Sequence, residues 1–397
     1  MIATSPPLIA HVIHALGVGG LENGLVNLIN RMPPERYRHA VVCLTTSDPA
    51  FAARIERPGV EVIALNKQAG KDPAVHARLW RTFRRLRPAI VHTRNLGALE
   101  AQLPAWLAGV PGRVHGEHGR DMADLDGSNA RHRLLRRALR PLVQRYVPLS
   151  RDLEAYLGTR IGVPATRITR ICNGVDTGRF RPDADGAARA ALQAQTGWPP
   201  GATLIGWVGR MEPVKNPLAL VDAFARLVAA GAGEAGDPRL VLVGTGSQQA
   251  EVERAVAAAG LGERVWLAGA RDDVDALMRA LDLFVLPSRA EGIANTILEA
   301  LASGVPVVAT AVGGNAELVA PGECGAIVPA DDVEALAAAM SEALADADDR
   351  SRAAAAARRR GVERFSIEAM VTAYTGLYDR LLAEVGEPVP ALARGTG

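Results

Sequence analysis

Short apolar segments alternate with longer stretches of helical periodicity along the whole chain. The apolar segments cover residues 8–16, 39–45, 60–65, 89–93 and 113–118 in the first half, and 203–209, 239–244, 264–269, 283–288 and 305–310 in the second. Strands that alternate with helices are typical of parallel sheets in α/β proteins. The pattern therefore predicts two doubly wound α/β domains.

The segment ICNGVDTGRFRPDADG, residues 171–186, separates the two sets of strands. Asn173-Gly174 is a turn signal, and the residues after it are rich in Asp, Gly and Pro. We expect an N-terminal domain over 1–173 and a C-terminal domain over 174–365. A last helix is expected over 366–384, with Ser366 as its N-cap and Glu368 in its first turn, crossing back to the N-terminal domain. Residues 385–397 are predicted to be a disordered tail.

Composition agrees with two soluble globular domains, because 397 residues exceed the size of one ordinary core. The 48% hydrophobic and 22% charged residues exclude a disordered or fibrous chain. Cys43, Cys172 and Cys324 are odd in number and far apart, which predicts buried thiols in a reducing cytoplasm. Residues 1–20 resemble a first strand more than a signal peptide, and no window reaches the roughly 18 apolar residues of a membrane span. We expect a cytoplasmic or peripheral protein.

The net charge of +2 hides an asymmetry between the halves of the chain. Residues 1–172 hold 25 Lys and Arg against 13 Asp and Glu, a net +12, whereas residues 173–397 have a net −10. Residues 77–88 place Trp80, Phe83 and Leu86 among five arginines, and residues 130–146 are also basic. Such a helix could lie on the anionic inner face of a membrane. The alternative, an ordinary helix that packs on the sheet, stays open; no nucleic-acid motif appears.

Two glutamates stand out in the apolar segment 288–310. Glu291 falls just after a predicted strand, and Glu299 falls eight positions later in a predicted helix. Ligands of α/β sheets bind at the carboxyl ends of strands and at helix N-termini. Eight helical positions separate the carboxylates by about 80° and about 12 Å, which suits an extended ligand better than one metal. The alternative makes Glu291 a helix-dipole partner and Glu299 a solvated helix residue.

Two cations follow the predicted strand 203–209. Arg210 and Lys215 lie in a loop stiffened by Pro213 and Pro217, so both could face one anion, of which a diphosphate is the obvious candidate. The alternative is a pair of ordinary surface charges.

A second polar cluster follows the predicted strand 113–118. It contains His115, Glu117, His118, Arg120 and Asp121. Ionisable residues at a strand end are candidates for a functional site. We prefer His118, although the repeat His-Gly-Glu-His leaves its register against His115 ambiguous.

Metal and dinucleotide signatures are weak. Asp-x-Asp triplets begin at Asp183, Asp273 and Asp346 in turn-like or helix-start contexts, and the triplet Asp124–Asp126 is less clear because it follows GEHGRD. We expect no metal site. The loop GVGGLENG fails the dinucleotide pattern G-x-G-x-x-G, since its third glycine would fall on Glu22.

Five motifs in consistent order resemble those of family 4 glycosyltransferases, which are retaining, nucleotide-sugar-dependent enzymes of the GT-B fold. EGIANTILE with ALASGVPVVAT resembles the E-x7-E region of that family. The other four are GVGGLENGLVNLI at 17–29, NGVDTGRF at 173–180, VGRMEPVKNP at 208–217 and VGGNAELV at 312–319. Together they cover nearly the whole chain. The resemblance implies two Rossmann-like, doubly wound domains facing a cleft.

The resemblance also implies roles. Arg210 and Lys215 would stabilise the diphosphate, Glu291 would hold the donor sugar, Glu299 would bind the ribose, and His118 would lie near the transferred sugar, without metal or cofactor. The acceptor would bind mainly to the N-terminal domain. Residues implied in donor binding are Gly19, Gly20, Gly209, Arg271, Gly292, Ile293, Ala294, Asn295, Thr296 and Glu299.

Other functions remain open at this point. They are a sugar-nucleotide epimerase or phosphorylase of the same fold, a non-catalytic nucleotide-binding scaffold, and an NAD-dependent oxidoreductase. EGIANTILEA and GEHGRDMADLDGSN are also similar to sugar transferases of exosortase/PEP-CTERM exopolysaccharide loci, which would imply a lipid-linked or polysaccharide acceptor. The motifs do not distinguish a UDP-, GDP- or ADP-sugar.

Overall fold

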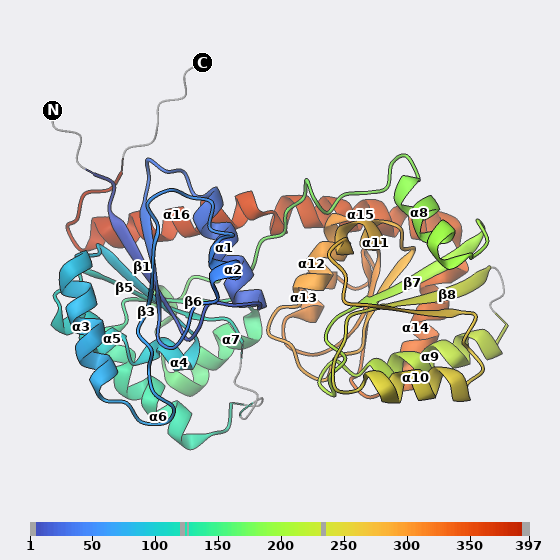
Figure 1. Ribbon diagram of the computed structural model, residues 1–397, viewed down its shortest axis with the longest axis horizontal. Helices are drawn as coiled ribbons and strands as arrows, with labels where there is room; N and C mark the ends of the chain where they lie inside the picture. Colours follow the sequence, from blue (N-terminus) through green and yellow to red (C-terminus); the bar gives the residue numbers. More distant parts are fainter. Residues whose placement is uncertain (1–4, 120–123, 125–126, 232–235, 391–397) are drawn as a thin grey trace, which may run out of the picture. The chain divides into compact units, whose positions relative to one another are not determined.

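The computed structural model describes residues 5–119, 124, 127–231 and 236–390, and the chain divides into two compact units (Figure 1). Unit 1 comprises Met1–Gly174 together with Ile367–Gly397, and unit 2 comprises Val175–Ser366. Each unit contains one six-stranded sheet in which all described strand pairs are parallel. The predicted α/β fold class is confirmed.

Unit 1 has the strand order β3-β2-β1-β4-β5-β6. Its strands are β1 (Leu8–Ile13), β2 (Arg38–Cys43), β3 (Glu61–Ala64), β4 (Ile90–Arg94), β5 (Gly112–Glu117) and β6 (Arg145–Pro148). Its α-helices are α1 (Gly20–Arg31), α2 (Pro49–Ala52), α3 (Ala74–Leu86), α4 (Asn95–Leu99), α5 (Gln102–Leu107), α6 (Ala130–Leu139), α7 (Arg151–Tyr156) and α16 (Ile367–Glu384), with short turns η1 (Arg140–Leu142), η2 (Leu157–Ile161) and η3 (Ala165–Arg167). The strand order runs outward in one direction from β1 and in the other from β4. Ligands of such sheets bind at the carboxyl ends of the two strands where the order reverses.

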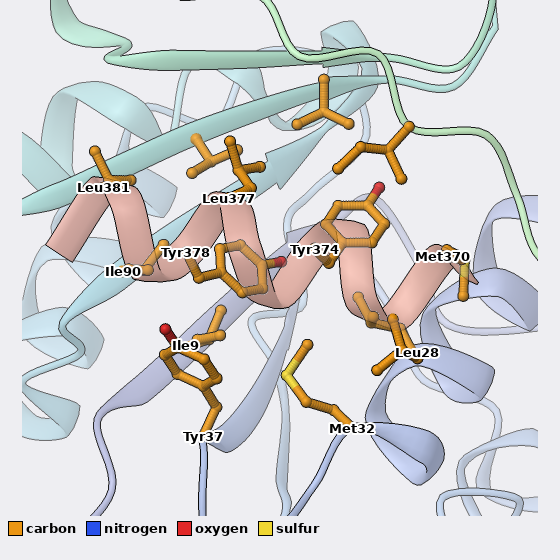
Figure 2. Close-up of a cluster of buried hydrophobic side chains, with 14 of the residues drawn as sticks. Ile9, Leu28, Met32, Tyr37, Ile90, Met370, Tyr374, Leu377, Tyr378 and Leu381 are labelled. Atoms are coloured by element: carbon orange, nitrogen blue, oxygen red, sulfur yellow. The ribbon is translucent and has the colours of Figure 1, made fainter. Parts of the chain in front are cut away.

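Helix α16 lies on the sheet of unit 1, although it is the last helix of the chain. Figure 2 shows Tyr378 between α16 and Ile9 of β1, close to Ile90 of β4, and Leu377 and Leu381 belong to the same buried cluster. All five side chains are essentially buried. The C-terminal segment therefore completes the core of the unit that the N-terminal segment begins.

Unit 2 has the strand order β12-β11-β10-β7-β8-β9. Its strands are β7 (Ala202–Val208), β8 (Asp237–Val243), β9 (Val265–Gly269), β10 (Leu283–Leu286), β11 (Val307–Thr310) and β12 (Gly325–Val328). Its helices are α8 (Ala187–Thr196), α9 (Pro217–Ala229), α10 (Gln249–Ala258), α11 (Val274–Arg279), α12 (Asn295–Ala302), α13 (Asn315–Val319), α14 (Val333–Ala345) and α15 (Ala347–Phe365). Because β7 and β10 are neighbours at the change of order, the loops that follow them emerge side by side.

Some details differ from the sequence prediction. Strands β6 and β12 were not predicted, because each is a four-residue strand at the edge of its sheet and lacks a long apolar run. Cys43 and Cys324 are buried as expected, but Cys172 is only partly buried; none of the three forms a disulfide with a described residue. In the last segment, the Pro390 carbonyl accepts a hydrogen bond from Arg36 at 2.6 Å, and residues 391–397 lie outside the described part. No described helix is both long enough and apolar enough to span a membrane.

Candidate functional site

Three loops of unit 2 are joined at the carboxyl edge of its sheet. The Arg289 amide donates to the Val214 carbonyl at 2.8 Å, and its guanidinium donates to the Pro213 carbonyl at 3.2 Å. Asp331, which follows β12, accepts from Arg289 Nε at 2.7 Å and from Asn216 Nδ2 at 3.1 Å through the same oxygen. This network fixes the loop after β7 against the loop after β10.

Lys215 and Glu291 form an ion pair across these two loops. The Lys215 Nζ lies 2.5 Å from Glu291 Oε1, and the Ser288 hydroxyl donates to the same oxygen at 2.7 Å. The Glu291 side chain is only 8% exposed. Its Oε2 has no hydrogen bond to any described residue, so one oxygen is left for a ligand. Glu291 also lies four residues before α12, outside the first helical turn, which argues against a simple helix-dipole role.

The glycines of the motif VGGNAELV hold the Glu291 loop from the other side. Gly313 has a φ of +53°, and a Cβ there would lie 2.0 Å from the Glu291 carbonyl oxygen. The Gly314 amide donates to the Gly292 carbonyl at 2.9 Å. Only glycine allows this close approach, which is a structural role that the sequence analysis did not assign.

Arg210 lies on the same loop as Lys215 but is exposed and makes no ion pair with a described residue. Its position is set by the backbone, because the Gly209 amide donates to the Val243 carbonyl at 3.0 Å. A Cβ on Gly244, whose φ is +128°, would lie 1.9 Å from the Gly209 carbonyl oxygen. The loop after β8 therefore packs closely against the Gly209 backbone and leaves the arginine free for a ligand.

Glu299 lies within α12 and is partly buried. No described residue forms a hydrogen bond or ion pair with its carboxylate. Burial raises the pKa of Glu299 to about 7; the charge of Arg179 opposes this shift, and that of Asp275 adds to it. The alternative interpretation made Glu299 a solvated helix residue. The observed carboxyl group differs from that, because it is neither fully hydrated nor bonded to a hydrogen-bond donor of a described residue.

The remaining residues of this region that were predicted to bind the donor lie at the start of α12, the helix that carries Glu299. Gly292, Ile293 and Ala294 form the loop that leads into α12, and Asn295 and Thr296 are its first two residues. Ala294, at the N-cap, has no side-chain oxygen to accept a hydrogen bond from the first-turn amides. The N-terminus therefore has donors suited to an anionic or hydroxyl-rich ligand.

Arg271 is placed apart from this arrangement. It follows β9 and forms a bidentate ion pair with Asp273 at 2.8 and 2.7 Å, above the Trp266 ring. No hydrogen bond or ion pair in the described part of unit 2 links it to Lys215 or Glu291.

In unit 1, the two candidate histidines have different environments. His115 is buried, with Nδ1 2.8 Å from the Thr93 hydroxyl and Nε2 3.3 Å from Glu117 Oε1. Glu117 also accepts from Arg136 Nε at 2.7 Å. Although burial opposes it, these hydrogen bonds lower the pKa of Glu117 to about 2. His115 thus belongs to a saturated structural network.

His118 has both ring nitrogens buried and without a hydrogen bond to a described residue. Its amide donates to Asn95 Oδ1 at 2.7 Å, and its ring folds over Gly116, where a Cβ would lie 2.6 Å from Nε2. Burial, followed by the charge of Arg94, holds the pKa of His118 well below its usual value. The ring is therefore a neutral group able to donate and accept one hydrogen bond each. Arg120 and Asp121, its predicted neighbours, lie outside the described residues.

The glycine-rich loop of unit 1 leads into α1, with Gly19 at the N-cap and Gly20 as the first helical residue. The Glu22 carboxylate folds back over Gly19, where a Cβ would lie 2.1 Å from Oε2. Burial raises the pKa of Glu22, and the charge of Arg94 opposes that shift. Arg94 is 3% exposed and donates to His11 at 3.0 Å. Sequence reasoning missed Glu22 and Arg94, because only the fold brings β1, α1 and the end of β4 together.

Most residues of the Asp-x-Asp triplets have structural partners. They accept from helix amides or pair with arginines: Asp183, Asp185, Asp273, Asp275 and Asp346. Asp124 accepts from the Asn129 amide at 2.8 Å and lies 3.1 Å from His132 Nδ1, while Asp126 lies outside the described residues. Within the described part of the chain, no three His, Cys, Asp or Glu side chains gather as a metal site would require.

Comparisons with known proteins agree with this architecture. The sequence model of Glycosyltransferase Family 4 matches residues 18–179, and that of Glycosyl transferases group 1 matches residues 188–360. The lipopolysaccharide core biosynthesis mannosyltransferase LpsB of Rhizobium meliloti (strain 1021) is 39% identical over 226 residues, which cover 54% of this chain and 61% of LpsB. The 2-deoxystreptamine N-acetyl-D-glucosaminyltransferase of Streptomyces fradiae is 37% identical over 179 residues, or 45% of this chain and 41% of that one.

The chain spans about half the length of the curated relatives it matches. Among solved structures, HepE of Anabaena in complex with UDP and glucose is similar with a TM-score of 0.78 and 22% identity, covering 94% of this chain and 99% of HepE. That likeness shows a common fold. Residues 18–179 thus match the Glycosyltransferase Family 4 model and residues 188–360 match the Glycosyl transferases group 1 model, in a chain that has the GT-B fold.

Proposed function

We propose that the protein is a retaining, metal-independent glycosyltransferase that moves a sugar from a nucleoside-diphosphate sugar to a hydroxyl acceptor. The observation that carries the proposal is the Lys215–Glu291 pair at the carboxyl edge of the unit 2 sheet, with an unpartnered Glu299 carboxyl on α12 eight positions after Glu291. The Glu291 carboxylate, the Lys215 cation and the Glu299 carboxyl group match the sugar, the diphosphate and the ribose, which follow one another in this order along one extended donor. The UDP and glucose bound by HepE support the same ligand class.

Each group has a chemical task in this proposal. Lys215 and the exposed Arg210 would neutralise the charge that develops on the leaving diphosphate. Glu291, through its free Oε2, would accept a hydrogen bond from a donor-sugar hydroxyl and stabilise positive charge at the anomeric carbon. Glu299 would accept hydrogen bonds from the ribose. The bond from the anomeric carbon to the diphosphate oxygen breaks, and the acceptor oxygen bonds to that carbon from the same face. The acceptor proton passes to the departing phosphate.

The neutral His118 would position the transferred sugar or the acceptor through hydrogen bonds without carrying a charge. The acceptor would bind to unit 1. The similarity to a lipopolysaccharide core mannosyltransferase supports a role in exopolysaccharide or glycolipid synthesis, with a lipid-linked or polysaccharide acceptor and a cytoplasmic location. An association with exosortase/PEP-CTERM loci is a narrower part of the same proposal and rests on the segments EGIANTILEA and GEHGRDMADLDGSN alone.

A thermal-shift screen against UDP-, GDP- and ADP-sugars tests the proposal first. A donor at 100 times its Kd should stabilise the protein by about 2.7 kcal/mol. The donor that stabilises is then incubated with lipid-linked and sugar acceptors in the presence of EDTA, and NMR identifies the anomeric configuration of the product. Stabilisation without turnover would favour a nucleotide-binding scaffold, and an inverted product would exclude the retaining reaction.

A further inference from the structure

Large apolar side chains gather on the surface of unit 1 between α3 and α5. Trp80 of α3 is 41% exposed, and Leu103, Trp106 and Leu107 of α5 are 39%, 51% and 59% exposed. We call these four residues the α3–α5 patch. The three residues of α5 recur at positions i, i+3 and i+4, so they share one face of that helix. Helices α3 and α5 are neighbours on one side of the unit 1 sheet (Figure 1).

The patch encloses a shallow hollow with a volume of about 390 Å³, lined by His76, Ala77, Trp80, Leu103, Pro104 and Leu107. The lining is almost wholly apolar, and both exposed tryptophans of the described chain belong to the patch. Single exposed apolar residues are normal on a soluble protein, but a contiguous group with two tryptophans indicates an interaction surface.

This surface shares only Trp80 with the apolar stripe expected from the sequence. Phe83 of that stripe is 1% exposed and packs with Leu79 in the core of unit 1, and Leu86 packs partly against the same core. That stripe therefore belongs mainly to an ordinary packed helix. Trp80, the remaining residue of that stripe, is exposed and lies beside residues of α5, which are more than 20 positions away along the chain.

The charged residues on the two helices of the patch are all positive. Helix α3 contains arginines but no Asp or Glu, and α5 contains no charged residue, although the exposed Glu100 lies two residues before it. On α3, Arg81 and Arg84 are exposed, and neither forms a hydrogen bond or ion pair with a described residue. Arg78 and Arg85 of the same helix, by contrast, pair with Asp72 and Glu61. The unpaired arginines thus adjoin the apolar surface, and Arg84 lies one helical turn from Trp80.

We propose that the α3–α5 patch docks on the anionic face of a lipid bilayer. Tryptophan and leucine side chains enter the region between headgroups and acyl chains, and arginines nearby bind lipid phosphates. A second copy of the chain fits less well, because a symmetric contact would bring the unpaired arginines of two α3 helices together without acidic residues on these helices to offset them. The proposal does not depend on the transfer reaction.

Vesicle binding of the full chain tests the proposal. Binding is measured by co-sedimentation with phosphatidylcholine vesicles and with mixed phosphatidylcholine–phosphatidylglycerol vesicles, and by the tryptophan emission spectrum. We expect binding and a blue shift with the anionic vesicles at low salt, and weaker binding as salt screens the charges. Trp198 and Trp207 are buried in unit 2 and should contribute little to the shift.

Variants separate the apolar and charged contributions. Trp106→Ser combined with Leu107→Ser should weaken binding at least tenfold. Arg81→Gln combined with Arg84→Gln should weaken it about thirtyfold, since each cation near an anionic surface contributes about 1 kcal/mol. Val362→Ser is the matched control, because Val362 is 37% exposed on α15 in unit 2 and should leave binding unchanged.

Two results would overturn the proposal. One is equal binding, or no binding, to neutral and anionic vesicles. The other is self-association in sedimentation velocity without vesicles that the patch variants abolish, which would assign the patch to a second copy. Melting curves of the free variants equal to that of the unmodified chain show that the patch variants are folded, and vesicle binding stands even if the proposed transfer reaction is disproved.

Discussion

Lys215 Nζ and Glu291 Oε1 lie 2.5 Å apart, so in the structure each of these residues neutralises the other. A bound diphosphate would compete with Glu291 for the lysine, and a bound sugar would compete with the lysine for Glu291. In the proposed function, the pair would therefore link recognition of the two parts of a donor. Mutations can separate the contribution of Glu291 from that of Lys215.

Glu291→Gln should lower kcat by about 10² to 10³-fold with a much smaller change in the donor KM. The amide retains the size of the side chain but removes the negative charge, which matters most where positive charge develops in the transition state. Steady-state kinetics with varied donor measure both constants. Ser288→Ala is the control, because it removes one hydrogen bond to the same oxygen but leaves the charge. Unchanged kcat in Glu291→Gln would assign the residue to structure alone.

Replacing Arg210 and Lys215 together by Ala should lower kcat/KM by about 10² to 10⁴-fold, because each charge-assisted hydrogen bond contributes about 1.5 to 3 kcal/mol. Activity of the double variant is compared with that of Arg226→Ala, which removes an exposed arginine of α9 in the same unit. Near-normal turnover in a folded double variant would exclude the diphosphate clamp.

Donor binding should weaken as the pH falls below about 7, since the raised pKa of Glu299 means that its carboxyl group becomes protonated there and loses an acceptor for the ribose. Calorimetric titration of the nucleotide at about pH 6 and about pH 8 measures this difference. Glu299→Gln should bind more weakly at the higher pH and lose most of the pH dependence. Stability should change in the opposite direction. The folded state holds the proton more tightly than the unfolded chain, so this group stabilises the fold below its unfolded pKa and loses that contribution as pH rises through about 7.

Gly313→Ala should lower both Tm and kcat. A Cβ at Gly313 would meet the Glu291 carbonyl oxygen at 2.0 Å, so the loop that carries Glu291 must shift. Gly260→Ala provides a matched control, because Gly260 also has a positive φ, of +66°, but nothing lies within 4 Å of its Cβ position. The control carries the backbone strain without the clash. Melting curves and kinetics that are equal in the two variants would disprove a role of Gly313 in placing Glu291.

The sequence predicted the fold class because parallel strands buried on both faces are continuous apolar segments. Residues 8–16 and 203–209, for example, contain β1 and β7, the strands next to the change of order in each sheet. The edge strands β6 and β12 are short and lack that pattern. They can be located only through their pairing with the neighbouring strands β5 and β11.

The candidate site was predictable only in its local parts. Lys215 and Glu291 were identified through motifs, but their ion pair spans 76 positions of the chain. The bracing of their loops by Asp331 depends on a third segment, and no local pattern reveals it. His115 and His118 could not be separated from spacing alone, because the choice depends on Thr93 and Glu117 filling the hydrogen bonds of His115.

The position of α16 sets an order for folding during synthesis. Unit 2 is one continuous segment, Val175–Ser366, so it can complete its core while the ribosome is still adding the last helix. Unit 1 begins first but lacks Tyr374, Leu377, Tyr378 and Leu381 until the end of translation. Until α16 is synthesised, one apolar face of the unit 1 sheet stays uncovered. Exposed apolar surface of this kind makes nascent chains aggregate or recruit chaperones. Unit 2, although most of it is synthesised after unit 1 has begun, is thus the unit that can complete its folding first.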